Sequence, residues 1–308
     1  MARFVQNLLR RPGPSGSESE RAAQDARETT RSHQPWWTRV GLPFWLSLGW
    51  LVLISLSAIL ADILPIDDPL STNLDTLFMT PLSEGHLLGT DAVGRDMLSR
   101  AIHGARISLQ LAFTAPFLSL LVGLVLGLSA GYFRGRVDTA VSVFTDSILA
   151  FPNIVGVMVI LFFFGASLPV MILALAFFGI PAEVRVARAN TILFSGREFV
   201  MAARALGASN LRIMVRELLP NVIVPMLSLV LFGMSIVIII EGSLAFLGVG
   251  FPPPTPSWGK MIADGFEDIS RAPHVTLVPA AVMFLTILSL NMIGDSLRAL
   301  TDVKASSL

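Results

Sequence analysis

Long apolar runs separated by short polar stretches recur along this chain of 308 residues. A helix needs roughly 20 apolar residues to cross the hydrocarbon core of a bilayer. The runs predict six membrane-spanning helices, at residues 43–63, 107–133, 142–164, 168–181 with an extension, 218–240 and 275–293. The fourth run is the shortest, at 14 residues, and could instead continue the third run across residues 165–169.

The distribution of Lys and Arg decides between these two interpretations, because cytoplasmic loops carry an excess of both. With six spans and a cytoplasmic N-terminus, 17 of the 22 Lys and Arg residues lie inside and 5 lie outside. Fusing the third and fourth runs would instead leave 11 on each side. The five outside are Arg95, Arg100, Arg106, Lys260 and Arg271. The pattern therefore predicts six spans, with both termini in the cytoplasm.

The composition agrees with an integral membrane protein. The chain is 53% hydrophobic and 14% charged, whereas roughly a quarter of the residues in soluble domains are charged. Its formal net charge is zero, so no basic field favours nucleic acid as a partner. Cysteine is absent and the four histidines lack metal-ligand spacing, so neither a disulfide nor a metal site is predicted. No cleaved signal peptide is expected either, because the first apolar run begins only at about residue 42.

The same pattern divides the chain into four parts. They are a cytoplasmic tail at residues 1–41, a first span with an external segment at 42–106, a core with the other five spans at 107–298, and a cytoplasmic C-terminal tail at 299–308. The N-terminal tail is rich in Arg, Ser and Glu and lacks an apolar period, which predicts disorder. Trp36 and Trp37 close to its end are typical of the headgroup level of a membrane.

A polar, Arg-bearing stretch at residues 195–220 interrupts the apolar runs. Ser195 and Glu198 have the spacing of a capping box, which predicts that a helix begins at Ser195. Gly207 should end this helix by adopting the left-handed conformation. Ser209 should then cap a second, short helix that lies at an angle to the first.

This stretch resembles the EAA loop of ATP-binding-cassette importer permeases. The match rests on the alanine pair at 202–203, on Gly207 and on the Leu-Pro pair at 219–220. Met201 and Glu217 depart from the pattern, which usually has Glu and an aliphatic residue there. In that family the loop is a cytoplasmic coupling helix that docks on an ATPase subunit. The residues that the resemblance implies for this contact are Arg197, Glu198, Ala202, Ala203, Arg204, Ala205, Leu206, Gly207, Ala208 and Ser209.

Two further segments are similar to the C-type permease subunit of dipeptide and oligopeptide importers. Residues 88–108 read LGTDAVGRDMLSRAIHGARIS, and residues 243–259 read SLAFLGVGFPPPTPSWG. In the first, Asp91 and Asp96 predict a turn followed by a helix cap. The second is rich in Gly and Pro, which predicts an external hairpin. The resemblance covers about residues 85–300 and implies an all-α membrane protein with the six-helix, type I importer (MetI-like) fold.

Three polar residues are candidates for a translocation path. Asp146 and Asn153 lie on the third predicted span, and Glu241 lies at the external end of the fifth. An ionisable residue at membrane depth usually faces a bundle interior or a water-filled path. Asp146 could instead pair with an Arg near the cytoplasmic face, and Glu241 could cap the next helix. Pro152 predicts a bend in the third span, because proline removes one helical hydrogen bond.

The chain lacks a Gly-x-x-x-x-Gly-Lys-Ser/Thr phosphate loop, an HExxH motif and a Gly-x-Ser-x-Gly elbow. No catalytic residue, metal or cofactor is therefore predicted for it. The resemblance implies a non-catalytic permease subunit that forms half of a path for di- and oligopeptides, with ATP and Mg bound by partner subunits. The implied partners are a B-type permease subunit, two ATP-binding subunits and an extracytoplasmic peptide-binding protein, assembled in a bacterial inner (plasma) membrane.

Alternatives remain open at this point. Nickel and glutathione importers have permeases with the same motifs, although no His or Met cluster here favours a metal cargo. From a different class, a proton-coupled secondary transporter would use Asp146 and Glu241 as a proton relay. A membrane-embedded hydrolase would need a nucleophile and a base that the sequence does not offer.

Overall fold

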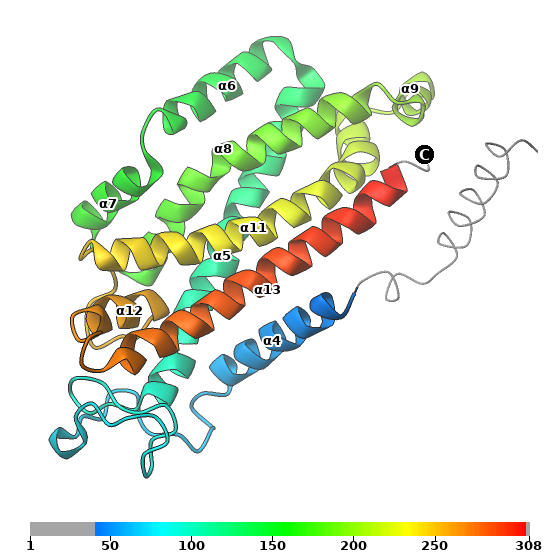
Figure 1. The fold of residues 1–308 in the computed structure, drawn as a ribbon. Helices are drawn as coiled ribbons and strands as arrows, with labels where there is room; N and C mark the ends of the chain where they lie inside the picture. The colour runs from blue at the N-terminus through cyan, green and yellow to red at the C-terminus, as the bar shows by residue number, and fades with distance from the viewer. Residues whose placement is uncertain (1–40, 306–308) are drawn as a thin grey trace, which may run out of the picture. The chain divides into compact units, whose positions relative to one another are not determined.

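A computed structural model describes residues 41–305 of the chain, with side chains described through residue 299. The predicted tail at 1–41 therefore lies outside the described residues, apart from residue 41. Helices are the regular elements of the described range (Figure 1). In chain order they are α4 (Leu42–Ile59), the 3-10 turn η1 (Leu74–Thr76), α5 (Met97–Phe133), α6 (Gly135–Leu149), α7 (Asn153–Phe164), α8 (Leu168–Ser195), α9 (Glu198–Ala205), α10 (Asn210–Arg212), the π-helical turn η2 (Ile213–Leu218), α11 (Leu219–Phe246), α12 (Trp258–Phe266) and α13 (Pro273–Ala305).

Five helical stretches of the described chain are long and apolar enough to cross a membrane: α4, α5, α8, the stretch Asn210–Phe246 and α13. Helices α6 and α7 qualify only as a pair, and this pair is bent by 79°. The predicted six spans are therefore reached when the pair counts as one broken span. Pro152 precedes the first residue of α7, as predicted for a bend, but the helix breaks completely there because proline lacks the N–H that would continue it.

Helix α5 begins at Met97, ten residues before the predicted start of the second span. Asp96 explains the early start, because its side chain accepts a hydrogen bond from the backbone N–H of Ser99 at 2.8 Å. Upstream, Asp91 Oδ1 accepts from the N–H groups of Val93 and Arg95 at 2.9 and 3.0 Å. The predicted turn and cap are confirmed, but much of the 88–108 segment belongs to a spanning helix.

Two other predicted spans are also too short. Helix α8 continues through Pro181 to Ser195, which confirms the extension that was expected for the weakest run. Helix α11 continues to Phe246, so Glu241 lies within the helix instead of at its end. Apolar runs underestimate the lengths of these helices, because a helix can continue through polar residues once tertiary packing supports it.

The main packing contact of the fold joins α5 to α8. Three glycines of α5 spaced four residues apart, Gly123, Gly127 and Gly131, line this contact and let the two backbones approach closely. A Cβ placed on Gly127 would lie 2.4 Å from the Cβ of Ala187, and one placed on Gly131 would lie 2.7 Å from the Cβ of Thr191. Neither distance leaves room for a larger side chain.

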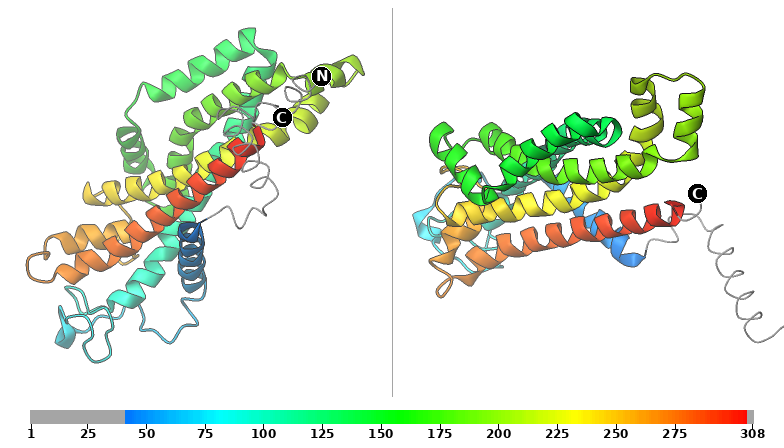
Figure 2. Two further views of the ribbon diagram at one scale, coloured as in Figure 1. Left: turned by 45° about the vertical axis from the view of Figure 1, so that its right-hand side comes forward. Right: turned by 90° about the horizontal axis from the view of Figure 1, so that it is seen from above.

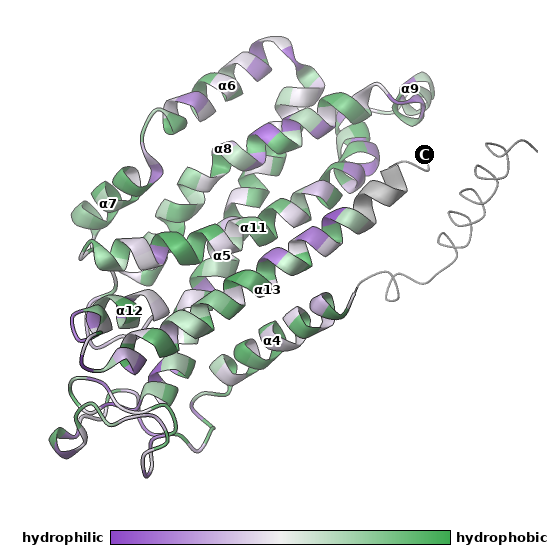
Figure 3. Cartoon of the chain, viewed as in Figure 1, coloured by the Kyte–Doolittle hydropathy of each residue, from purple (hydrophilic) through white to green (hydrophobic). Residues whose placement is uncertain are grey.

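The other helices pack around this pair. Helix α11 contacts α5, α8 and α13, and α12 lies against α11 and α13 (Figures 1 and 2). Helix α4 is mostly exposed, and Trp50 Nε1 fastens it to α13 by donating to Thr286 Oγ1 at 3.1 Å. Arg106 of α5 holds its end by donating to the carbonyl of Ala58 at 3.1 Å. Hydrophobic residues dominate the middle of the long helices (Figure 3), as expected for surfaces that face lipid.

The glycine contact between α5 and α8 can be tested by adding one methyl group. Gly127→Ala should destabilise the fold by about 1–3 kcal/mol, because the methyl overpacks the contact with Ala187. Gly49→Ala is the matched control, since a Cβ on Gly49 of α4 meets nothing within 4 Å. The thermal unfolding midpoint of each detergent-solubilised variant measures the effect. Equal midpoints for the two variants would contradict the close approach.

Candidate functional site

The polar stretch at 195–220 does not begin as predicted. Ser195 lies in the last turn of α8, where its hydroxyl donates to the carbonyl of Ile192 at 3.0 Å. Helix α9 begins at Glu198 after Arg197, without a side-chain cap. The predicted capping box of Ser195 and Glu198 is therefore wrong, because α8 extends to Ser195 and its hydroxyl is already bonded within that helix.

The end of α9 follows the prediction. Gly207 adopts a φ of +79°, and its N–H donates to the carbonyl of Arg204 at 3.0 Å. The N–H of Ala208 donates to the carbonyl of Ala203 at the same distance. These two bonds form a Schellman motif, which requires a left-handed residue at the position of Gly207. A Cβ there would meet nothing within 4 Å, so the requirement is conformational and not a matter of space.

Ser209 caps the next helix as predicted, since its hydroxyl accepts from the N–H of Arg212 at 3.4 Å. The helix does not remain short, however. It passes from α10 through η2 directly into α11. The stretch is therefore a hairpin that joins two spanning helices, with α9 packed against η2 (Figure 2). We call residues 196–218 the α9 hairpin.

The α9 hairpin has a buried side and an exposed apolar side. Val200 is fully buried and belongs to the main hydrophobic core, with Ala203 packed against that core. Phe199, Met201 and Leu206 do not belong to this core and are 38%, 55% and 89% exposed. Large apolar side chains that stay exposed on a polar hairpin are typical of a surface that binds another protein.

Tyr132, the only tyrosine of the chain, ties the α9 hairpin to the end of α5. Its hydroxyl donates to Asn210 Oδ1 at 2.9 Å. The guanidinium of Arg204 lies over its ring, 5.8 Å from the ring centre, in the arrangement of a cation–π contact. Tyr132 was not predicted as a functional residue, because nothing in the local pattern around residue 132 indicates a partner more than 70 residues away.

Asp146 pairs with an arginine, Arg185 of α8. This agrees with the alternative drawn from the sequence, in which Asp146 forms an ion pair and does not line a path. Its carboxylate lies 2.9 Å from a guanidinium nitrogen of Arg185, and both side chains are well exposed. Arg188 of α8 pairs in the same way with Asp138 of α6. These two ion pairs connect α6 to the C-terminal half of α8, which is predicted to lie on the cytoplasmic side.

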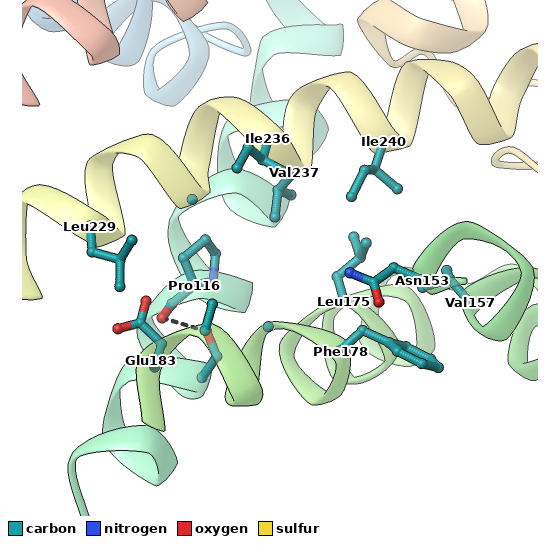
Figure 4. A pocket seen from close by; sticks show the side chains of 14 residues that line it. Pro116, Asn153, Val157, Leu175, Phe178, Glu183, Leu229, Ile236, Val237 and Ile240 are labelled. Atoms are coloured by element: carbon teal, nitrogen blue, oxygen red, sulfur yellow. Dashed lines mark hydrogen bonds between the residues drawn. The ribbon is translucent and has the colours of Figure 1, made fainter. Parts of the chain in front are cut away.

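A cavity of about 170 Å³ lies between α5, α7, α8 and α11 (Figure 4). It is lined by Pro116, Ser119, Asn153, Val157, Leu175, Phe178, Gly179, Ala182, Glu183, Leu229, Gly233, Ile236, Val237 and Ile240. The lining is mostly apolar and its polar side chains are few, which is the usual character of a small-molecule site. Of the three path candidates, Asn153 lines this cavity, whereas Asp146 and Glu241 do not.

Glu241 is fully buried beside α12. Its Oε1 accepts a hydrogen bond from Ser257 Oγ at 2.6 Å, and Ser257 Oγ in turn accepts from the N–H of Lys260 as the cap of α12. A Cβ on Gly259 would lie 2.8 Å from Glu241 Oε2, so the start of α12 sits directly on the carboxylate. Glu241 therefore acts on the next helix through its capping serine and does not cap that helix itself.

Glu183 of α8 is a second buried carboxylate, at 4% exposure, and it lines the cavity. Its Oε2 has no hydrogen-bonding partner among the described residues. Glu183 was not predicted as a candidate because it follows the apolar run 168–181 and lies in the extension of that span, for which no end was predicted. The continuation of α8 through Pro181 places it inside the bundle.

One group of described side chains has the composition of a metal site. Ligand atoms of Asp67, His86 and Asp96 lie within 4.8 Å of one another. His86 Nδ1 is hydrogen-bonded to Asp96 Oδ1 at 3.0 Å, and Asp96 also caps α5. These bonds account for the cluster as part of the packing of the segment between α4 and α5, and we assign no metal to it.

Comparison with known proteins identifies the family. Residues 123–306 match the model of the binding-protein-dependent transport system inner membrane component. The dipeptide transport system permease protein DppC of Alkalihalophilus pseudofirmus is 37% identical over 262 residues, covering 84% of this chain and 86% of that protein. The glutathione transport system permease protein GsiD of Pectobacterium atrosepticum is 34% identical over 257 residues, with 83% and 85% covered.

A solved structure shows the same fold. A chain from inward-facing conformations of the MetNI methionine ABC transporter superposes with a TM-score of 0.55 at 18% identity, covering 66% of this chain and 97% of that chain. This likeness confirms the importer-permease fold expected from the sequence. The chain belongs to the family of binding-protein-dependent transport system inner membrane components, and it is a non-catalytic, multi-pass permease subunit of an ABC importer.

Proposed function

We propose that this chain is the C-type permease of an ATP-driven importer of di- and oligopeptides, and that the α9 hairpin is where ATP hydrolysis is coupled to transport. The observation that carries the coupling role is the exposed apolar side of the hairpin at Phe199, Met201 and Leu206. The cargo class is supported by relatives named for dipeptide transport, among them the di/tripeptide permease DppC of Pseudomonas aeruginosa, at 37% identity over 262 residues.

The connections of the α9 hairpin suit a mechanical role. It joins α8 to α11 without a flexible linker on the α11 side, and Tyr132 connects it to α5. A displacement of α9 is thereby transmitted to three helices that line the cavity. Shear or rotation of packed helices is a common way for a small displacement at one site to open another.

The assembly proposed around this chain has four kinds of partner: a B-type permease, two ATP-binding subunits and an extracytoplasmic peptide-binding protein. In this arrangement the α9 hairpin and both termini face the cytoplasm of a bacterial cell, in line with the excess of Lys and Arg on that side. Asn153 is the path candidate best supported by position, because it lines the cavity.

The competing functions predict different energy sources and cargoes. Glutathione import has one observation in its favour, the similarity to GsiD. A proton-coupled transporter has less support, since Asp146 is paired with Arg185 and Glu241 is bonded to Ser257. Uptake of a labelled dipeptide by the reconstituted complex should stop when ATP is withheld and persist when the proton gradient is dissipated. The reverse result would reject an ATP-driven importer.

The proposed orientation is tested by single cysteines in this cysteine-free chain. Leu82→Cys and Leu206→Cys lie at positions that are 84% and 89% exposed. An impermeant thiol reagent added to intact spheroplasts should label the first and spare the second until the membrane is permeabilised. Labelling of residue 206 alone in intact spheroplasts would show that the orientation is the reverse of the proposed one.

The requirement for Gly207 is tested by a matched pair of substitutions in one hairpin. Gly207→Val forces a β-branched residue to positive φ, at a cost of about 1–3 kcal/mol. Gly196→Val adds the same side chain where φ is −90° and nothing lies within 4 Å. We expect normal membrane levels for both variants, but at least a severalfold loss of peptide-stimulated ATP hydrolysis for Gly207→Val alone. Equal hydrolysis by the two variants would argue against the coupling role.

The external side of the path is tested at Glu241. Glu241→Gln keeps the size of the side chain but weakens the hydrogen bond from Ser257, because a charged acceptor binds more strongly than an amide. If α12 acts as an external gate, the variant should assemble normally and hydrolyse ATP with fewer peptides imported per ATP. If the variant is expressed normally and imports as many peptides per ATP as the wild type, Glu241 has a packing role only.

A further inference from the structure

The cavity between α5, α7, α8 and α11 contains one group whose chemistry is not used by the packing. Its walls are mostly aliphatic and aromatic, and Ser119 is already engaged because its hydroxyl donates to the carbonyl of Pro116 at 2.9 Å. Glu183 extends from α8 into the space facing Leu229, while Asn153 of α7 lies at the other end of the lining (Figure 4). The cavity thus has a carboxylate at one end and an amide at the other.

No described cation neutralises Glu183. The two arginines that follow it on α8 point to other partners, Arg185 to Asp146 and Arg188 to Asp138. On the α5 side the carboxylate stem rests against Gly123, where an added Cβ would lie 2.3 Å from the Glu183 Cβ. The base of the side chain is therefore packed against α5, yet its Oε2 has no hydrogen-bonding partner among the described residues.

An unpaired carboxylate is an expensive group to place at membrane depth. Its ionised form is tolerated in an apolar site only when a positive charge or several hydrogen-bond donors meet it. Charge-assisted hydrogen bonds between an ammonium and a carboxylate are among the strongest in proteins. A cation that enters the cavity would therefore bind Glu183 more strongly than it would bind a carboxylate that already has a partner.

We propose that this cavity binds an aminoalkyl group of the cargo, such as a lysine side chain, with its ammonium on the Glu183 carboxylate and its alkyl chain on the apolar walls. A volume of about 170 Å³ suits one such group and not a whole peptide, since sites for complete drug-sized ligands occupy roughly 300–1,000 Å³. The inference rests on the proposed function and narrows it: cationic peptides are favoured over anionic cargo such as glutathione.

A labelling experiment tests the site without requiring transport. The reconstituted complex is treated with dicyclohexylcarbodiimide, which modifies carboxyl groups in apolar surroundings, and modified Glu183 is quantified by mass spectrometry. n-Butylammonium reproduces the lysine side chain and n-butanol is its neutral counterpart. We expect n-butylammonium to slow the labelling of Glu183 about tenfold, as a charge-assisted bond implies, and n-butanol to slow it less than about twofold.

A second buried carboxylate serves as the control for this experiment. Glu241 is equally buried but is bonded to Ser257 and does not line the cavity, so its labelling should not respond to either compound. Equal slowing of Glu183 by both compounds would reduce the effect to steric exclusion and overturn the proposal. Complete absence of Glu183 labelling without competitor would overturn it as well, because a site open to cargo must be open to this reagent.

A transport experiment separates this proposal from the proposed function. Uptake of Ala-Lys-Ala is compared with uptake of Ala-norleucine-Ala, in which the ammonium group of lysine is replaced by a hydrogen atom. Glu183→Gln should raise the KM for the lysine peptide about tenfold relative to the norleucine peptide, and Glu183→Asp should restore part of the preference. Equal KM changes for the two peptides would overturn the role of Glu183. Failure of the wild-type complex to import either peptide would count against peptide import, while the labelling result would still decide the cation site.

Discussion

The close approach of α5 and α8 through three glycines is the constraint on which the rest of the structure depends. Small residues at the contact let two long helices pack backbone to backbone, which in a bilayer supplies the dispersion energy that hydrophobic burial cannot. The fit is tight enough that Gly123 leaves no room beside the stem of Glu183. The same contact therefore holds the bundle together and fixes a carboxylate at the edge of the cavity.

The two buried carboxylates illustrate two uses of the same side chain. Glu241 Oε1 accepts a hydrogen bond from the serine that caps α12, although its Oε2 has no hydrogen-bonding partner among the described residues, and this bond links the carboxyl group to the start of a neighbouring helix. Glu183 has no side-chain hydrogen bond of this kind among the described residues and lines the cavity instead. Buried carboxylates are costly unless paired, and each of the two keeps one oxygen without a partner among the described residues. The fold gives Glu241 a partner in Ser257, whereas Glu183 faces a space that a ligand can enter.

The sequence was a good guide wherever one local rule determined the structure. The cap at Asp96, the left-handed Gly207 and the cap at Ser209 all follow from the conformational preferences of single residues. It failed where tertiary packing outweighed a local signal. Ser195 has the spacing of a capping residue, but α8 continues through it.

The candidate site was predictable to a similar extent. The α9 hairpin was located by its polarity, its small residues and its resemblance to a known loop, and Asn153 is the path candidate that lines the cavity. Glu183 and Tyr132 could not be identified, because their importance depends on residues brought close by the packing of α5 and α8. Apolar runs mark where a helix must face lipid, and they do not reveal which polar neighbours the bundle encloses.

The central claim is that the exposed apolar side of the α9 hairpin binds the ATP-hydrolysing subunit. It is tested most directly by placing a photo-crosslinking amino acid at Leu206, with Leu82 of the segment between α4 and α5 as the control, since both side chains are more than 80% exposed. Irradiation of the intact complex should join residue 206, and not residue 82, covalently to an ATPase subunit. A crosslink from residue 82 to the ATPase, or none from residue 206 in a complex that hydrolyses ATP, would contradict this account.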